Sequence, residues 1–366
     1  MRWMRILREL GHRVHIARRY NGAAADLMIA LHAWRSADSI RNFRELYPDR
    51  PLIVGLSGTD IYDYIDRDPA PTLRSLACAD RLVALQELVR RRVPARFRRK
   101  VRVVHQSAVP LPRVHRRRTR RFDVAVIGHL REVKDPFRAA KAARRLPATS
   151  RIRVVHLGAA ETPQWAATAK AEMAANPRYL WRGDRPRADV RRLLDGARAM
   201  VLSSLSEGGA NVISEAVAAG VPVLATRIEG SVGLLGRDYP GYFPVGDTEA
   251  LAQLLNRIET DTAFLERLHR AIARRAHLFR PALEKAAWRK LIEEIMLKSS
   301  PRRGRDPARA RIRNSRAGAD LWPVWDHGQL RRTGECPHPV AVRWLVARDP
   351  AIDDCGYSAR TAGRAV

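Results

Sequence analysis

Short apolar runs alternate along most of the chain with longer segments in which apolar residues recur every three or four positions. A run of four or five apolar residues is typical of a strand buried on both faces, and the longer periodic segments are typical of amphipathic helices. The strand-like runs in the first part of the chain are residues 13–17, 27–31, 52–56, 81–85 and 101–104. Helical patterns, such as those at 36–46 and 72–77, lie between most of these runs, which predicts a doubly wound parallel sheet.

The same alternation returns in the second part of the chain. Its strand-like runs are residues 124–127, 152–155, 199–202 and 221–225. Helices are predicted at 137–145, 163–175, 187–197, 212–219, 248–259, 263–276 and 282–297. Sheets of this class bind ligands in the crevice outside the carboxyl ends of their strands. We therefore expect an α/β protein of two Rossmann-like, doubly wound domains that face each other across a cleft.

Changes in composition divide the chain into five parts. Residues 109–121 are rich in proline and arginine, which is typical of a linker. We expect an N-terminal domain at 1–108, a C-terminal domain at 122–280 and a closing helix at 281–298. From Ser299 onward the periodicity is lost and arginine, proline and glycine dominate. Residues 299–366 are therefore expected to be disordered or to be an out-of-frame extension.

The beginning of the chain departs from the usual order of elements. Its first pattern is helical, from Trp3 to Leu10, and Gly11 ends it. A doubly wound domain normally starts with a strand and a glycine-rich turn before its first helix. We therefore expect the first strand of the N-terminal domain to be missing and that domain to be truncated at its start.

The segment from Ser203 to Glu215 carries the strongest functional signal. It follows the strand-like run 199–202 and opens an alanine-rich helix that reaches Gly220. The amide groups at a helix start favour a phosphate, and the glycines at 208 and 209 let a ligand approach the backbone closely. With Glu207 in the loop and Glu215 one turn into the helix, the segment suits a ligand with phosphates and vicinal hydroxyls, such as a nucleotide-sugar. A helix cap at Glu207 and a solvated Glu215 are the alternative.

The formal net charge is +30, and arginine is densest between Arg90 and Arg121. Three interpretations follow: a solvated basic face, attraction of anionic substrates or lipid headgroups, or nucleic-acid binding. Before Phe122 this run contains only one aromatic residue, Phe97, so no stacking platform for bases is evident. We therefore favour the solvated face and expect no nucleic-acid partner.

Cysteine content and apolar runs limit the compartment. The chain has three cysteines, and two of them, Cys336 and Cys355, lie in its final segment. No disulfide framework is implied, and a cytoplasmic location fits best. No apolar run reaches the length of a membrane span, and Arg2, Arg5 and Arg8 break any signal-peptide pattern. We expect no stable membrane insertion.

With these residues in view, the chain resembles the GT-B glycosyltransferases that carry a Glu-x7-Glu motif, here Glu207 and Glu215. More narrowly, it is similar to the selenosugar synthases of selenoneine biosynthesis. The resemblance covers about residues 3–296. The blocks that carry it are 30–36, 56–60, 105–108, 128–136, 207–212, 230–236 and 238–247.

The resemblance implies a metal-independent transfer, without a cofactor, of a hexose from a UDP-sugar, either UDP-GlcNAc or a related donor. The implied acceptor is selenophosphate, and the products are a selenosugar, UDP and phosphate. The implied catalytic residues are Glu207, Lys134, Arg131 and His32. The implied donor-binding residues are Gly208, Gly209, Ala210, Asn211 and Glu215.

Within that scheme Glu215 holds the ribose diol, and Glu207 positions the hydroxyls of the donor sugar. Lys134 and Arg131 follow the strand-like run 124–127, where fixed cations would stabilise charge on the leaving phosphate. Arg131 is the softer assignment, because His129 occupies the place of the arginine that the family uses.

Polar residues that follow two strands of the N-terminal domain are the candidates for the acceptor site. His32, Arg35 and Ser36 come after the run 27–31, and Thr59 and Asp60 come after 52–56. Cationic positioning of selenophosphate matters more than a strong base, because its selenium is already largely deprotonated. A structural histidine and a turn cap at Thr59–Asp60 are the other interpretations.

Two other functions stay open. One is a GT-B transferase that acts on a lipid or polysaccharide and docks its basic face on an anionic membrane. The helices of the first domain have no long apolar stripe with tryptophan or phenylalanine anchors, which disfavours it. The other is an inactive remnant of a transferase, which the absent first strand would explain.

Overall fold

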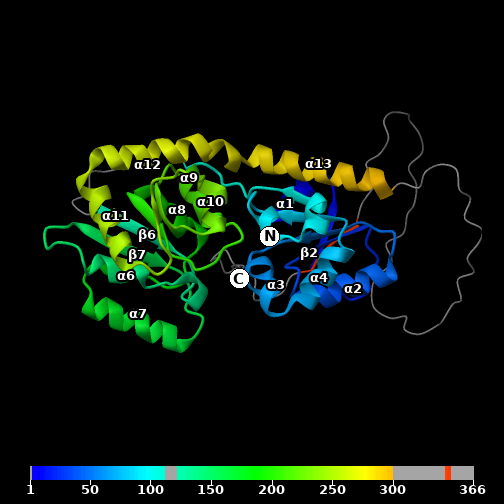
Figure 1. Cartoon of the computed structure of the whole chain (residues 1–366), viewed down its shortest axis with the longest axis horizontal. Helices are drawn as coiled ribbons and strands as arrows, with labels where there is room; N and C mark the ends of the chain where they lie inside the picture. The colour runs from blue at the N-terminus through cyan, green and yellow to red at the C-terminus, as the bar shows by residue number, and fades with distance from the viewer. Residues whose placement is uncertain (1, 112–121, 300–342, 348–366) are drawn as a thin grey trace, which may run out of the picture.

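The computed structural model describes residues 2–111, 122–299 and 343–347, and the side chains of 2–111 and 122–297. Two α/β domains lie side by side, and each is built on a six-stranded parallel sheet (Figure 1). The strand order is β1-β12-β2-β3-β4-β5 in the N-terminal sheet and β11-β10-β9-β6-β7-β8 in the C-terminal one. The expected architecture of two doubly wound domains is confirmed.

The N-terminal sheet is formed by β1 (Arg13–Ala17), β2 (Leu27–Leu31), β3 (Leu52–Gly55), β4 (Arg81–Ala84), β5 (Val101–Val103) and β12 (Arg343–Ala347). Its helices are α1 (Arg2–Glu9), α2 (Ala37–Leu46), α3 (Ile65–Arg67), α4 (Pro69–Cys78) and α5 (Val89–Arg92), with the short turns η1 (Asp60–Tyr64) and η2 (Ala95–Lys100). Strands β2, β3 and β4 are buried on both faces apart from partly exposed Leu31, as their continuous apolar runs predict.

The C-terminal sheet is formed by β6 (Phe122–Ile127), β7 (Ile152–Leu157), β8 (Tyr179–Trp181), β9 (Ala199–Leu202), β10 (Val223–Thr226) and β11 (Tyr242–Phe243). Its helices are α6 (Arg138–Ala143), α7 (Pro163–Ala175), α8 (Arg187–Gly196), α9 (Asn211–Ala218), α10 (Glu229–Leu235), α11 (Thr248–Thr260) and α12 (Thr262–Arg275). The turns η3 (Glu132–Lys134) and η4 (Ala276–Phe279) complete it. Side-chain oxygens of Thr162, Asp247 and Asp261 cap α7, α11 and α12.

Strand β12 lies inside the N-terminal sheet although it belongs to the last part of the chain. It pairs in parallel with β1 on one side, Arg13 opposite Arg343, and with β2 on the other, Leu27 opposite Trp344. A strand that fed α1 and β1 by a right-handed crossover would occupy this same position. The strand expected to be missing before α1 is thus replaced, in space, by β12.

The expectation that 299–366 lacks regular structure does not hold for Arg343–Ala347. Without a strand at this position, β1 and β2 would present unpaired backbone groups in the middle of the sheet. Residues 340–347 are apolar apart from Arg343 and lie between Pro339 and Pro350, so their composition fits a buried strand. The rest of that expectation concerns residues outside the described ranges.

Helix α13 (Pro281–Ser299) follows the C-terminal domain in sequence but packs on the N-terminal one. Figure 1 shows it continuing beyond α12 along one side of the molecule and lying over α1. Trp288 is fully buried, and its ring lies edge-on to that of Trp3 at 4.7 Å between centroids. Glu294 accepts hydrogen bonds from Arg102 and Arg81, which lower the pKa of this carboxyl to about 2. The N-terminal domain therefore includes a distant helix in its core and a distant strand in its sheet.

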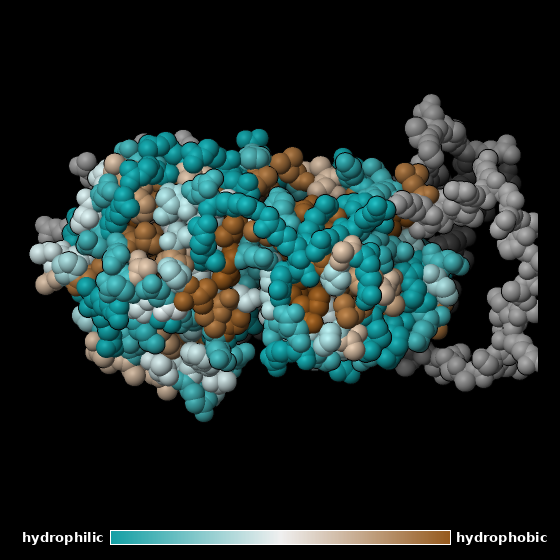
Figure 2. All heavy atoms as spheres, in the orientation of Figure 1, coloured by the Kyte–Doolittle hydropathy of each residue, from teal (hydrophilic) through white to brown (hydrophobic). Residues whose placement is uncertain are grey.

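The outer surface is mostly hydrophilic on the face shown in Figure 2, where a notch separates the two lobes. Within the described residues, no helix combines the length and the apolar character that crossing a bilayer requires.

Candidate functional site

The two domains touch where the loop after β3 meets the loop after β9. A Cβ atom on Gly58 would lie 2.4 Å from the amide nitrogen of Gly208, and one on Gly208 would lie 2.4 Å from the carbonyl oxygen of Ser57. Gly58 also has a φ of +119°, which other residues rarely adopt. Glycine at both positions lets the backbones of the two domains approach this closely. The carboxyl edges of β3 and β9 thus face each other across the Glu207 loop.

Glu207 lies in this contact and is held by two side chains. Its Oε1 accepts hydrogen bonds from the Lys134 ammonium and from the Ser204 hydroxyl, each at 2.6 Å. The two side chains of the ion pair are only 11% and 9% exposed. Gly230 closes the other side, because a Cβ there would lie 2.1 Å from the carbonyl oxygen of Glu207. The carboxylate and the ammonium are therefore fixed at the domain boundary.

The loop that carries Lys134 is bound to the Glu207 loop along its length. The Ser203 hydroxyl donates to the carbonyls of Lys134 and Asp135, and the Leu205 amide donates to the carbonyl of Val133 at 2.8 Å. Asp135 has a φ of +44° and accepts from Arg138 at 2.6 Å. These contacts place the ammonium of Lys134 without help from a ligand.

Arg131 and His129 lie earlier in the same loop. Burial lowers the pKa of His129, and the charges of Arg131 and Lys134 lower it further. The Nε2 atom of His129 is buried and has no hydrogen-bond partner in the described part of the chain. An imidazole with a lowered pKa therefore lies next to two cations, at the position where the family that the sequence resembles uses an arginine.

Helix α9 begins directly after the loop. Ala210 precedes it, and no side chain caps its first turn. Asn211 donates to Oε1 of Glu215 at 3.0 Å, and Arg187 lies 3.7 Å from the same oxygen. Glu215 is only 8% exposed. A helix start without a side-chain cap thus lies between two carboxylates, Glu207 and Glu215, that belong to the predicted donor-binding segment.

The residues predicted for the acceptor lie together on the N-terminal side. Nε2 of His32 is 2.9 Å from the Thr59 hydroxyl, and His32 has a φ of +73°, which is uncommon for a residue other than glycine. Asp60 is fully buried and accepts from the backbone amides of Ala33, Ser57 and Gly58. The carboxylate of Asp60 therefore holds the loop after β2 against the loop after β3.

Two further residues of this group differ in exposure. The Ser36 hydroxyl is buried and donates to the Leu31 carbonyl at 2.6 Å, whereas Arg35 is partly exposed. Next to them, Trp34 stacks on Tyr64 with 4.2 Å between ring centroids. Arg35 is the member of this group whose charge is most accessible to an acceptor.

Sequence reasoning gave no role to three residues that contact the predicted ones. Ser204 donates to Glu207, Arg187 lies beside Glu215, and Arg2 donates to Asn211 at 2.6 Å. Ser204 lies within the quoted motif, so its position was a usable signal. Arg2 and Arg187 are two of many arginines, and only the folded chain brings them to the site.

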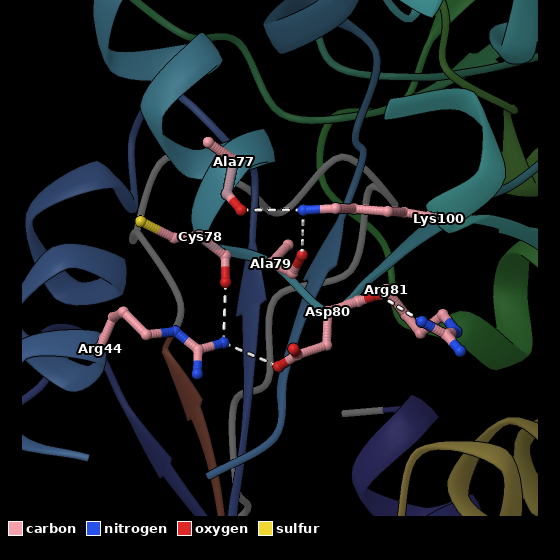
Figure 3. A pocket seen from close by; sticks show the side chains of 7 residues that line it. All are labelled: Arg44, Ala77, Cys78, Ala79, Asp80, Arg81 and Lys100. Atoms are coloured by element: carbon pink, nitrogen blue, oxygen red, sulfur yellow. Dashed lines mark hydrogen bonds and ion pairs between the residues drawn. The ribbon is translucent and has the colours of Figure 1, made fainter. Parts of the chain in front are cut away.

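A cavity of about 620 Å³ lies at the opposite edge of the N-terminal sheet and is lined by Arg44, Cys78, Asp80 and Lys100, among others (Figure 3). Its cations are already bound within the protein. Arg44 donates to the Cys78 carbonyl and to Asp80, and Lys100 donates to three carbonyls at the end of α4. Burial lowers the pKa of Lys100. This cluster holds the end of α4 and the start of β4. Each described cation that lines the cavity is bound to protein groups, so none is left for a ligand.

No group of three or more histidine, cysteine, aspartate or glutamate side chains in the described ranges could hold a metal ion.

Comparisons with known proteins agree with this architecture. HepE of Anabaena in complex with UDP aligns with a TM-score of 0.63 at 16% identity, over 74% of this chain and 79% of its own. The α,α-trehalose 6-phosphate synthase of Burkholderia multivorans aligns with a TM-score of 0.63 at 14% identity, over 78% and 74% of the two chains. Sucrose-phosphate synthase of Thermosynechococcus elongatus gives 0.59 at 17% identity, over 75% and 74%. No curated protein sequence matches the chain significantly.

The sequence itself matches one family. Residues 110–276, which include Lys134, Glu207 and Glu215, match the glycosyl transferases group 1. This match covers the C-terminal domain, and the similar structures extend the likeness to both domains. Residues 110–276 are therefore similar to the glycosyl transferases group 1, and the whole described chain has the two-domain GT-B fold of the similar structures.

Proposed function

We propose that the protein transfers a hexose, GlcNAc or a related sugar, from a UDP-sugar to selenophosphate, which makes a selenosugar for selenoneine biosynthesis. Selenium attacks the anomeric carbon of the donor, the bond from that carbon to the UDP oxygen breaks, and UDP leaves with the bonding electrons. Water then cleaves the phosphorus–selenium bond and releases phosphate and the selenosugar. The observation that carries the proposal is the uncapped start of α9 between Glu207 and Glu215.

The donor half of the proposal rests on this helix start. Backbone amides of residues 208–211 bind the diphosphate, because the positive end of the helix dipole favours an anion there. Glu215 is nearly buried and accepts the ribose hydroxyls, which replace part of its contact with Asn211. HepE of Anabaena has been crystallised with UDP and with UDP-glucose, and its fold is the one described here.

Departure of UDP requires stabilisation of negative charge. Lys134 is held in place by Glu207 and by the Ser203 contacts, so its ammonium needs little reorganisation when charge develops on the leaving phosphate. Arg131 adds a second cation from the same loop. Glu207 binds hydroxyls of the donor sugar and sets the distance between the sugar and Lys134.

The acceptor half rests on the group at the ends of β2 and β3. His32 and Thr59 form a polar pair at 2.9 Å, and Arg35 offers a partly exposed guanidinium. The imidazole of His32, the hydroxyl of Thr59 and the guanidinium of Arg35 can donate hydrogen bonds to the oxygens of a tetrahedral phosphate. Asp60 and Ser36 act through the loops that they hold, because their side chains bond to backbone groups.

A lipid or polysaccharide acceptor is the second candidate, and an exposed basic surface favours it. Arg90, Arg91, Arg92, Arg98 and Arg99 are exposed on the N-terminal domain. The structure of WaaB, a lipopolysaccharide outer core galactosyltransferase, also aligns with this chain at a TM-score of 0.54 and 15% identity, over 74% of this chain and 75% of its own. Salt-sensitive pelleting with anionic liposomes would favour this acceptor class.

A single assay separates the candidates. The purified full chain is incubated with UDP-GlcNAc or UDP-glucose and with selenophosphate, thiophosphate or phosphate, and UDP release and product mass are recorded. The proposal predicts a selenosugar only with selenophosphate, and loss of product in Glu207→Ala, Glu215→Ala and Lys134→Ala. Arg144→Ala, which breaks an exposed ion pair with Glu172 in the same domain, is the matched control. UDP release that is independent of selenophosphate, or unchanged turnover in all three variants, contradicts it.

A further inference from the structure

Arg2 joins three parts of the molecule that are far apart in sequence. It is the first residue of α1, and its guanidinium donates to the backbone carbonyl of Ser107, to the carboxylate of Glu284 at 3.3 Å and to the side-chain oxygen of Asn211 at 2.6 Å. The side chain of Arg2 is 19% exposed. One partly buried cation thus contacts the N-terminal domain, α13 and the first residue of α9.

Two of these partners lie where the chain crosses between the domains. Ser107 belongs to the segment that leaves the N-terminal domain, and Glu284 lies in the first turn of α13, which returns to it. The amide and the hydroxyl of Ser107 both donate to Oε2 of Glu284, at 2.8 and 2.6 Å. The Ala108 amide donates to the Phe279 carbonyl at 3.0 Å. The two segments that connect the domains, at residues 107–108 and 279–284, are therefore hydrogen-bonded to each other.

Glu284 is buried to 1% exposure, and its Oε1 has no hydrogen-bond partner among the described residues. A buried carboxylate of this kind depends on a nearby cation, and loss of that cation leaves an uncompensated charge. Arg2 is the cation in contact with it. The positive charge of Arg2 therefore compensates the buried carboxylate of Glu284 at the connection between the domains.

The third partner connects this network to the donor site. Asn211 accepts from Arg2 through its oxygen and donates through its nitrogen to Glu215 at 3.0 Å. Asn211 is 6% exposed. A continuous chain of contacts therefore runs from the domain crossings through Arg2 and Asn211 to the carboxylate assigned to the ribose.

We propose that Arg2 is a positioning residue that couples binding of the UDP portion of the donor to the arrangement of the two domains. The proposal rests on the proposed function, because it takes Asn211 and Glu215 as donor-binding residues. Movement of α9 away from α1 would break the bond between Arg2 and Asn211. A ligand that holds α9 and Glu215 in the observed position therefore favours the observed arrangement of the two domains, and that arrangement favours the ligand to the same extent.

The test measures UDP binding by calorimetry on the full chain, together with thermal unfolding and the radius of gyration in solution. Arg2→Lys keeps a charge beside Glu284, but one ammonium lacks the fork that reaches three acceptors. It is expected to unfold near the wild-type temperature and to weaken UDP binding about tenfold, which lies within the range of allosteric couplings. Arg2→Ala should weaken UDP binding at least as much and enlarge the radius of gyration.

Arg5→Ala is the matched control, because Arg5 lies on the same helix but pairs with Glu9 in solvent. It should bind UDP as the wild type does. Wild-type UDP affinity in Arg2→Lys, with normal unfolding, overturns the coupling and leaves the proposed function intact. A wild-type chain that binds no UDP overturns the proposed function and the coupling together. In kinetics the coupling predicts a raised KM for the UDP-sugar with a smaller change in kcat. A variant that is merely unfolded in part would instead show a lower apparent kcat and an unchanged KM.

Discussion

The two domains have the same architecture but are assembled differently. The strands of the C-terminal sheet all come from residues 122–243, whereas the N-terminal sheet contains β12 and packs against α13. The family match covers 110–276 and so falls on the self-contained domain. The residues assigned to the donor lie there, while those assigned to the acceptor lie on the composite one. A self-contained domain can be recognised from local sequence, and a composite one depends on contacts that local sequence does not reveal.

The largest expected effect is on the composite sheet. Deletion of residues 300–366 removes β12 and exposes backbone groups of β1 and β2, each of which costs about 1–3 kcal/mol when it is buried without a partner. We predict that hydrogen exchange in β1 and β2 becomes fast while exchange in β6 and β9 stays slow. Deletion of 348–366 alone, which keeps β12, is the control. Equal protection of β1 in both truncations would contradict the role of β12.

The second effect concerns α13. Trp288→Ala removes a fully buried ring from the N-terminal core and is expected to cost about 3–5 kcal/mol of unfolding free energy. Leu283→Ala on the same helix is the control, because that side chain is 48% exposed. Denaturant unfolding measures both. A loss in Trp288→Ala no larger than in the control would mean that α13 does not stabilise the N-terminal domain.

Catalysis should depend most on the self-contained domain. Lys134→Ala removes the cation expected to stabilise the leaving phosphate, and kcat should fall about 10²–10³-fold, as for loss of one preorganised charge-stabilising group. Unfolding should change little. The same kcat in Lys134→Ala and wild type would show that the ion pair with Glu207 is structural.

Within the composite domain, His32 should affect the acceptor and not the donor. His32→Ala removes the imidazole that contacts Thr59, and we expect KM for selenophosphate to rise about tenfold, the equivalent of 1.4 kcal/mol. KM for the UDP-sugar should stay unchanged. His15→Ala, on the exposed side of β1, is the control. A rise in KM for the UDP-sugar would show that His32 acts on the donor, which contradicts its assignment to the acceptor.

The smallest effect is on pH-dependent stability. The pKa of Glu294 is lowered from 4.5 to about 2 by Arg102 and Arg81, so its contribution is present above pH 4.5 and is lost as the pH falls toward 2. Glu294→Gln should lower the unfolding temperature at pH 7 and flatten its dependence on pH between these limits. An equally steep dependence in the variant would assign the acid sensitivity to other carboxyls.

Much of the fold could be predicted from the sequence. The apolar runs predicted most of the strands, and the pattern for α7 predicted its bounds, Pro163–Ala175. The strands β8 and β11 were missed, because they have three and two residues and carry little periodic signal. Helix α10 was missed because glycines interrupt its pattern. Strand β12 was missed although residues 340–347 form an apolar run with one arginine, because the segment around it is rich in arginine, proline and glycine and its parallel partners are distant in sequence.

The site shows the same limit. The spacing of Glu207 and Glu215 could be read from the chain, because one loop and one helix carry both. The ion pair of Glu207 with Lys134 joins residues 73 positions apart, and Arg2 reaches Asn211 across 209 positions. Such contacts depend on the folded arrangement of both domains, so composition and periodicity could not supply them.

A crystal structure of the full chain with UDP tests the central claim most directly. The account predicts the diphosphate against the backbone of residues 208–211 at the start of α9 and the ribose hydroxyls on Glu215. UDP bound at any other place, or none bound at saturating concentration, would contradict it.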